Sequence, residues 1–203
     1  MNGETGRKIS KDNEDRVDNI LVALADRMCP IFKEMNYTAN GITTLSLITS
    51  IAAIYYLMRR DMTNFTFYYM IAYFFDVMDG YYARKYKIYS DFGDKYDHYK
   101  DIVVTSIIVL IAYDHYEATC YPVALCVMIG LIVLMTVYLG CHEKIADKEI
   151  GSTILNNLAY VSKEKCIDNM PIIRLFGTGS VQIAAIIYIW YLSYQHTKKY
   201  SIG

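Results

Sequence analysis

The sequence predicts an all-α integral membrane protein: a bundle of five to six transmembrane helices preceded by an N-terminal amphipathic surface helix. Three observations support this fold class. Hydrophobic residues make up 54% of the 203 residues, and charged residues make up only 20%. The apolar residues gather in uncharged runs, several of which are long enough to cross a bilayer as helices. Lysine-bearing polar segments separate some of these runs.

The first residues are polar and contain no cleavable signal peptide. We expect residues 1–16 to form a polar tail and residues 17–203 to form a single membrane domain. Within residues 17–35 apolar side chains recur at helical spacing, at Val17, Ile20, Leu21, Leu24 and Met28. Because this segment also carries charges, it predicts an amphipathic helix that lies on the membrane surface or on the protein itself.

Five later segments have the composition of membrane spans. Residues 41–58 carry no charge, and 18 residues in a helix rise about 27 Å, close to the thickness of the hydrocarbon core. The other four are residues 62–83, a helix over 102–113 that begins earlier, residues 119–141, and a segment that starts near Phe176. The 142–169 segment is too polar for a span, but it contains an amphipathic pattern at Ile154, Leu155, Leu158 and Val161.

The distribution of basic residues predicts the orientation in the membrane. The 84–100 loop and the 142–169 segment carry several lysines, which places both in the cytoplasm together with the N-terminus. The 114–118 loop has no lysine or arginine, as expected of an outer loop. Arg59 and Arg60 fall on the outer side and oppose this assignment.

Charge and cysteine content exclude other classes of protein. The formal net charge is −1, so no overall field attracts nucleic acid, and we expect no nucleic-acid partner. The five cysteines show no CxxC pair and no regular spacing. We therefore predict neither a disulfide framework nor a zinc site.

Four aspartates lie at helical spacing where two of the predicted helices meet. Asp76 and Asp79 share one helix face, and Asp97 and Asp101 share a face of the next helix. Burial of each ionised carboxylate costs several kcal/mol, so four acids at membrane depth need counter-charge. Mg²⁺ or Mn²⁺ suits oxygen ligands, and two such ions are the usual means of displacement at phosphorus.

Residues beside the acids are compatible with a bound nucleotide. Gly80 leaves the helix surface without a side chain, and Ala83 is small on the adjoining face. Arg84 supplies a fixed positive charge for phosphate oxygens. Gly93 permits close approach to the same ligand at the start of the next helix. The joint pattern, more than any single residue, indicates a functional site.

Together these residues resemble the signature of the CDP-alcohol phosphatidyltransferases, D-x2-D-G-x2-A-R-x8-G-x3-D-x3-D. Every fixed position is present, as Asp76, Asp79, Gly80, Ala83, Arg84, Gly93, Asp97 and Asp101. The resemblance implies that the four aspartates hold two metal ions and that Asp101 is also the general base. It further implies that the other four residues bind the nucleotide.

Two further regions are compared with the family. Residues 38–43 are similar to the T-P-N-x-x-T opening of the first span, with alanine in place of the common proline. This implies a nucleotide role for Asn40 and Thr43, although a helix cap and a helix-lining hydroxyl are equally good interpretations. The family typically has six spans, whereas only five are found here. Arg174 is a candidate acceptor or phosphate contact from the region of the sixth, or a snorkelling interfacial arginine.

The resemblance implies an enzyme that transfers a phosphatidyl group from a CDP-alcohol to an acceptor alcohol and releases CMP. The chain length favours CDP-diacylglycerol as donor, with inositol, glycerol 3-phosphate or serine as acceptor. Two alternatives are a choline or ethanolamine phosphotransferase that acts on diacylglycerol, and a membrane transporter of metal ions lined by acidic residues. The expected partners are both substrates and membrane lipids, and a homodimer is a candidate assembly.

Overall fold

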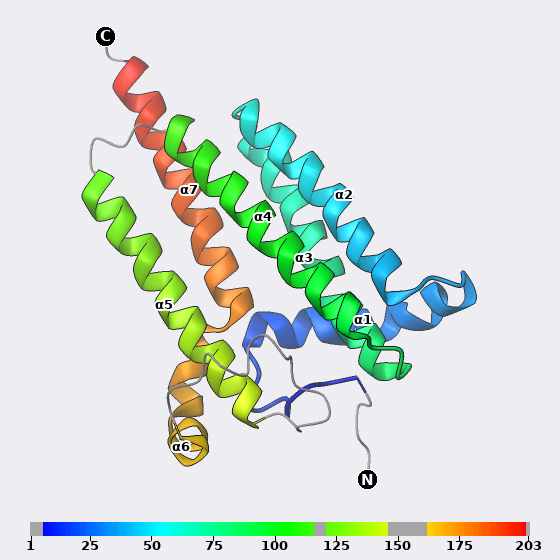
Figure 1. Ribbon diagram of the computed structural model, residues 1–203. Coiled ribbons are helices and arrows are strands. Elements are labelled where there is room, and N and C mark those ends of the chain that lie inside the picture. Colours follow the sequence, from blue (N-terminus) through cyan, green and yellow to red (C-terminus); the bar gives the residue numbers. More distant parts are fainter. Residues whose placement is uncertain (1–5, 116–120, 146–161, 202–203) are drawn as a thin grey trace.

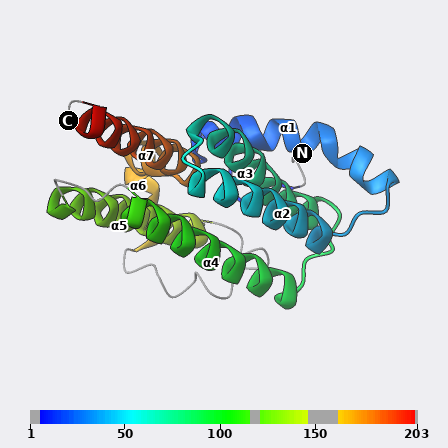
Figure 2. The same cartoon turned by 90° about the horizontal axis from the view of Figure 1, so that it is seen from above.

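The computed structural model describes residues 6–115, 121–145 and 162–201, and all regular structure in these ranges is helical. Helix α1 (Arg16–Glu34) lies across one end of a set of long helices that run side by side (Figures 1 and 2). The long helices are α2 (Ala39–Met58), α3 (Met62–Lys85), α4 (Asp91–His115), α5 (Tyr121–Ile145) and α7 (Thr178–Ser201). The shorter α6 (Lys163–Ile173) and a 3-10 turn, η2 (Arg174–Phe176), precede α7.

The predicted helices correspond closely to those observed. The surface helix predicted over 17–35 is α1, and the five predicted spans are α2, α3, α4, α5 and α7. Helix α4 begins at Asp91, so the earlier start predicted for the 102–113 segment is confirmed. Helix α6 was not predicted as a separate helix. The amphipathic pattern of residues 154–161 lies outside the described residues.

Two described segments have the length and hydropathy to cross a membrane. One is Ala39–Met58, which is α2, and the other is Lys163–Lys198, which includes α6, η2 and most of α7. They coincide with the first and last of the predicted spans. The other three spans remain predictions.

Helices α2, α3 and α4 pack around a shared apolar core. Leu57 of α2, Phe65 of α3 and Val104 of α4 are buried in one cluster, to which α7 adds Ile189. Toward the α1 end of the bundle, the Ser46 hydroxyl of α2 donates a 2.9 Å hydrogen bond to a backbone carbonyl of α3. Helix α2 therefore packs against both α3 and α4, and it is the main link between them.

Helix α1 is attached to α3 by both apolar and polar contacts. Tyr81 and Tyr82 of α3 are buried beneath α1. The Tyr81 hydroxyl donates to Asp26 of α1 at 2.7 Å, and the Lys85 ammonium contacts the same carboxylate at 2.5 Å. Hydrogen bonds from Lys85 and Tyr81 lower the pKa of Asp26. Helix α1 is therefore fixed to the bundle by its own contacts with α3.

Asp15 joins the starts of α1 and α7. Its carboxylate caps α1 by accepting a 2.6 Å hydrogen bond from the Val17 amide, and it also accepts from the Ser180 amide of α7 at 3.2 Å. The side chain is fully buried. A β-carbon at Gly177 would lie 2.4 Å from that of Asp15, so only glycine permits this approach.

The prediction that the chain has no disulfide was wrong. Cys141, near the end of α5, and Cys166, in α6, form a disulfide with a Cα–Cα distance of 5.3 Å. The two cysteines are 25 residues apart in the sequence. Their spacing follows no pattern, so only the packing of α6 against α5 reveals the pair.

We predict that Asp15→Ala destabilises the protein more than Asp61→Ala. Both aspartates cap a helix, and loss of a cap costs about 1 kcal/mol. Asp15 also satisfies the Ser180 amide, and a buried amide left without a partner costs a further 1–3 kcal/mol or so. Thermal unfolding of the purified variants in detergent measures the difference. Equal losses of stability would contradict the proposed link between α1 and α7.

Candidate active site

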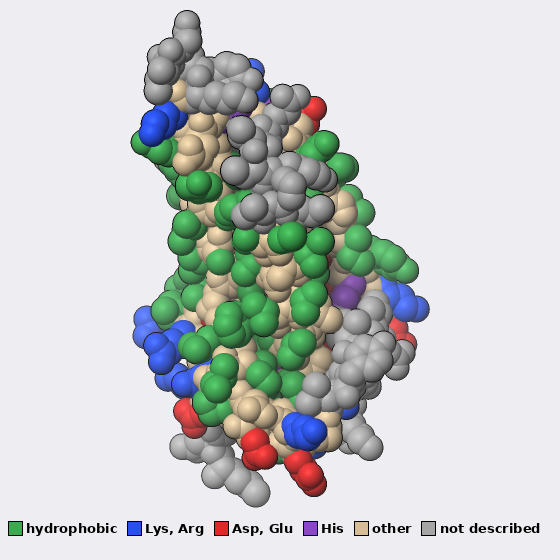
Figure 3. Space-filling view, turned by 90° about the vertical axis from the view of Figure 1, so that its left-hand side faces the viewer, with side chains coloured by type: hydrophobic (Ala, Val, Ile, Leu, Met, Phe, Trp, Pro, Cys, Tyr) green, Lys and Arg blue, Asp and Glu red, His purple; other side chains and the backbone are tan. Residues whose placement is uncertain are grey.

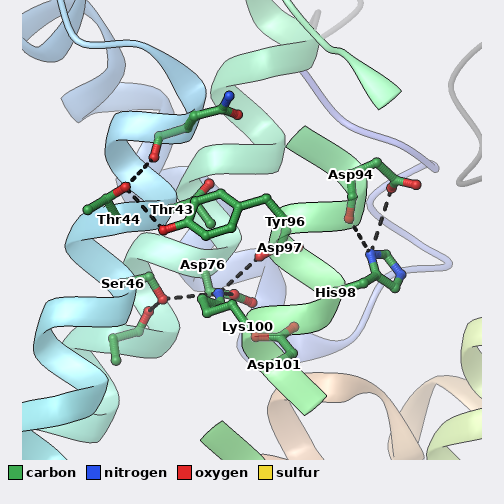
Figure 4. A network of polar contacts seen from close by, with 12 residues as sticks. Thr43, Thr44, Ser46, Asp76, Asp94, Tyr96, Asp97, His98, Lys100 and Asp101 are labelled. Carbon is green, nitrogen blue, oxygen red and sulfur yellow. Dashed lines mark hydrogen bonds and ion pairs between the residues drawn. The ribbon is translucent and has the colours of Figure 1, made fainter. Parts of the chain in front are cut away.

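The four signature aspartates lie in the second half of α3 and the first half of α4, and Figure 4 shows three of them, Asp76, Asp97 and Asp101. Asp76 of α3 and Asp97 and Asp101 of α4 can each direct a carboxylate oxygen to within 4.8 Å of the others. The helical spacing predicted from the sequence therefore brings acids from two helices together. Their exposure differs, since the side chain of Asp101 is 51% exposed and that of Asp97 is 29% exposed.

Asp79 is the most enclosed of the four acids. It is 5% exposed, and the Thr43 hydroxyl of α2 is a hydrogen-bond partner of its side chain. Within the described part of the chain, its Oδ2 atom has no hydrogen-bond partner. A buried carboxylate oxygen without a partner is costly, so this atom is suited to receive a cation.

Lys100 inserts its ammonium among the other three acids. Its Nζ contacts Asp76, lies 2.9 Å from Asp97 and 3.1 Å from Asp101, and donates to Ser46 at 3.2 Å (Figure 4). Lys100 is the last residue of the lysine-bearing loop predicted over 84–100, and the sequence predicted no role for it in the site. Its position three residues after Asp97 was the available signal, because residues at this spacing share a helix face.

The first turn of α2 reaches α4 through Asn40. The Thr38 side chain caps α2, so the interpretation of Asn40 as the cap is wrong. A β-carbon at Gly93 would lie 2.8 Å from the Asn40 side-chain oxygen, which explains the glycine. The interpretation of Thr43 as a helix-lining hydroxyl is confirmed, because its hydroxyl donates a 3.2 Å hydrogen bond to the Ala39 carbonyl of the same helix. Two residues from the predicted nucleotide set, Asn40 and Gly93, are thus in contact.

Arg84 lies over Gly80 and is held by the N-terminal segment. Its guanidinium would be 3.1 Å from a β-carbon at Gly80, so the surface left open by this glycine is occupied by the arginine. The Arg84 Nε donates a 2.9 Å hydrogen bond to the Gly6 carbonyl. Ala83, on the same turn of α3, is partly buried.

A cavity of about 200 Å³ extends from these residues toward α1 and α5. Signature residues that line it are Asp76, Asp79, Gly80, Arg84 and Asp97. The remaining lining includes Lys8 from the N-terminal segment and His142 and Glu143 from α5. Part of the cavity lining therefore comes from residues outside the signature.

Lys8 and Glu143 were missed because they are far apart in the sequence and match no motif. They form an ion pair that fastens residues 6–15 across the cavity to α5. Burial lowers the pKa of Lys8, although the attraction of Glu143 opposes this shift. Arg174 does not belong to the cavity lining. It donates a hydrogen bond to the Asp12 carbonyl and so holds the same N-terminal segment.

The sequence that forms this site resembles a known protein family. A family model described as CDP-alcohol phosphatidyltransferase matches residues 36–196, which is most of the chain and includes all four aspartates. The chain belongs to the CDP-alcohol phosphatidyltransferase family. Comparisons with curated proteins and with solved structures found no match.

Membership of the CDP-alcohol phosphatidyltransferase family accounts for the convergence of these residues. The family transfers substituted phosphate groups, and it is generally dependent on divalent metals. The acids of this chain fit such an ion, because they supply carboxylate oxygens from two helices and include the unpartnered Oδ2 of Asp79.

Asp18 of α1 closes the cavity from the side of the surface helix. It lines the cavity, accepts a hydrogen bond from Tyr73 of α3, and accepts from the Gly179 amide of α7 at 3.4 Å. Burial raises its pKa from 3.8 to about 7, with nearby Asp15 and Glu14 adding repulsion. Asp18 therefore takes up a proton in the folded protein near neutral pH.

We predict that Asp18 makes the protein less stable as pH rises from about 4 to about 7. Across this range the folded state keeps a proton that the unfolded state has lost, so ionisation at higher pH opposes folding. The slope from one such group is at most about 1.4 kcal/mol per pH unit. Asp18→Asn should flatten the dependence of thermal stability on pH.

The matched control is Asp26→Asn on the same helix. Contacts with Lys85 and Tyr81 lower the pKa of Asp26, so this residue stays ionised over the same range and its removal should leave the slope unchanged. An unchanged slope in the Asp18 variant would show that Asp18 does not titrate as described.

Proposed function

We propose that this protein is a divalent-metal-dependent phosphatidyltransferase. It transfers the phosphatidyl group of CDP-diacylglycerol to the hydroxyl of a small acceptor such as inositol, glycerol 3-phosphate or serine, and releases CMP. The observation that carries the proposal is the complete signature on α3 and α4, five residues of which line one cavity, in a chain whose family transfers phosphatidyl groups from CDP-alcohols.

Each signature residue has a role in this proposal. Asp76, Asp79, Asp97 and Asp101 hold the divalent ions, which when bound offset the negative charge of the diphosphate. The nucleotide binds over the α3 and α4 backbone, with Gly80, Ala83, Arg84, Gly93, Asn40 and Thr43 as its contacts. Arg84 is already within the cavity and is suited to phosphate because its guanidinium presents a fork of N–H donors.

The reaction exchanges one phosphorus–oxygen bond for another. The acceptor hydroxyl oxygen bonds to the β-phosphorus of the donor, and the bond from that phosphorus to CMP breaks. The hydroxyl proton passes to the Asp101 carboxylate. Asp101 suits this role because its side chain is the most exposed of the three clustered acids and can reach an acceptor that enters from outside.

The exterior of the bundle supports a multi-pass membrane location. Large apolar side chains are exposed along the long helices, for example Ile51, Phe67, Leu110, Val133 and Ile187. Figure 3 shows hydrophobic side chains over the middle of one face, whereas acidic and basic side chains gather mainly at the end that carries α1. Such a surface suits contact with lipid chains. Five helices then span the bilayer, with α1 at its surface.

The lysine distribution orients the α1 end and the active site toward the cytoplasm. The disulfide between Cys141 and Cys166 lies at this end of α5. Disulfides are rare in reducing compartments. The proposed orientation therefore implies that the two cysteines are reduced to thiols in the cell.

Neither alternative function is as well supported. A choline or ethanolamine phosphotransferase is suggested by the His98 that follows Asp97, but the His98 ring lies 2.9 Å from the Asp94 carbonyl on its own helix (Figure 4). A metal transporter would need the acids but would leave Gly80 and Arg84 without a role.

We predict that the purified protein releases CMP from CDP-diacylglycerol only when an acceptor and a divalent ion are present. The direct test is CMP release with each acceptor in turn, in EDTA and after addition of excess Mg²⁺ or Mn²⁺. EDTA should abolish release, and either ion should restore it. Full activity in EDTA would contradict the metal dependence, and no release with any acceptor would contradict the proposed donor.

A second prediction separates a metal ligand from a base. Asp79→Asn removes charge from the most enclosed acid, so donor binding and turnover should fall together. Asp101→Asn should lower turnover by about 10²–10⁴-fold, the usual contribution of a general base, and should weaken donor binding much less. Titration of donor binding beside turnover distinguishes the two. Equal loss of binding in both variants would make Asp101 chiefly a ligand.

A further inference from the structure

The ammonium of Lys100 lies among the acids at the place that a metal ion would take. Its side chain is 2% exposed, although lysine is almost never fully buried unless it is paired. It contacts Asp76, Asp97 and Asp101, and these are the same three acids whose oxygens lie close enough together to share an ion. The amine and a metal ion would therefore compete for the same ligands.

The two cannot be held together at these oxygens. An ammonium 2.9–3.1 Å from two of the carboxylates fills the space in which a metal ion would approach the same atoms. Like charges at such a separation also repel strongly in a partly buried site. Entry of an ion among these three acids thus requires the amine to leave.

Asp79 provides a separate position. Its Oδ2 is buried without a hydrogen-bond partner in the described ranges, and none of the ion pairs of Lys100 involves it. The Lys100 ammonium therefore takes the cation position among Asp76, Asp97 and Asp101, and Asp79 offers a second one.

The balance of charge leads to the same division. With all four carboxylates ionised, as metal ligands are, the acids and the one ammonium carry a net charge of −3. One divalent ion would change this charge to −1 and two would change it to +1, so with the lysine in place a second ion makes the cluster positive. Removal of the lysine charge would let two ions neutralise the four acids. Burial favours the arrangement in which charges are balanced.

We propose that Lys100 is an internal cation that holds one of the two metal positions. In the absence of nucleotide, the protein binds a single divalent ion on the Asp79 side of the cluster. The negative diphosphate of a bound donor then restores the balance that admits a second ion as the amine withdraws. This inference rests on the proposed function, because it takes the signature acids as the metal site.

The test is to count the ions bound by the full-length protein in detergent without nucleotide. Mn²⁺ is titrated into the metal-free protein, and free Mn²⁺ is measured by electron paramagnetic resonance. The wild type should bind one ion. Lys100→Met and Lys100→Gln should bind two, the second at least about tenfold more tightly than in the wild type. Lys95→Met, which removes an exposed lysine of the same helix, should bind one.

Thermal unfolding provides a second readout for variants that are poorly stable without metal. In EDTA both Lys100 variants should unfold at a lower temperature than the wild type, because their acids lack a counter-ion. Saturating Mn²⁺ should raise their unfolding temperature by more than it raises that of the wild type. An equal rise would count against the proposal.

The outcomes separate this inference from the proposed function. Two ions in the wild type, or one in both Lys100 variants, would overturn the role of Lys100 while metal-dependent CMP release still upheld the proposed function. No bound ion in any variant, together with CMP release in EDTA, would overturn both.

Discussion

The crowding of four carboxylates at the junction of α3 and α4 is the constraint on which the rest of the site depends. Acids on two helices come close enough to share a cation, and one of them is almost fully buried. Such an arrangement is stable only where positive charge is supplied. The chain supplies part of it through the Lys100 ammonium, which contacts three of the four acids.

The surface helix has a part in the same site. Helix α1 holds Asp18 at the cavity, and Asp15 at its start joins α7 through the Ser180 amide. The segment before α1 crosses the cavity, where the Gly6 carbonyl accepts from Arg84 and Lys8 pairs with Glu143. The helix that the sequence predicted to lie on the membrane surface or on the protein itself is therefore also a wall of the cavity, and residues 6–15 lie beside Arg84.

Burial separates the acids into different chemical environments. Asp79 is enclosed beside the Thr43 hydroxyl and keeps one oxygen free of hydrogen bonds, which favours a permanent ligand. The Asp101 side chain is half exposed and is held only by the shared lysine, which favours a group that meets the acceptor. Helical spacing in the sequence does not distinguish these acids from one another, but their different burial in the bundle does.

The sequence by itself determined the helices and the acidic motif, because both depend on short-range periodicity: uncharged runs predict long helices, and acids three or four residues apart share a face. It could not show that Lys100 occupies the cluster, that Lys8 and Glu143 close the cavity, or that Cys141 pairs with Cys166. It also left Asn40 open between a cap and a site residue, and the structure gives the cap to Thr38 and places Asn40 beside Gly93. Some of these features join residues that are distant in the sequence. Others depend on which neighbour a flexible side chain contacts. Tertiary packing decides both, and the sequence pattern does not.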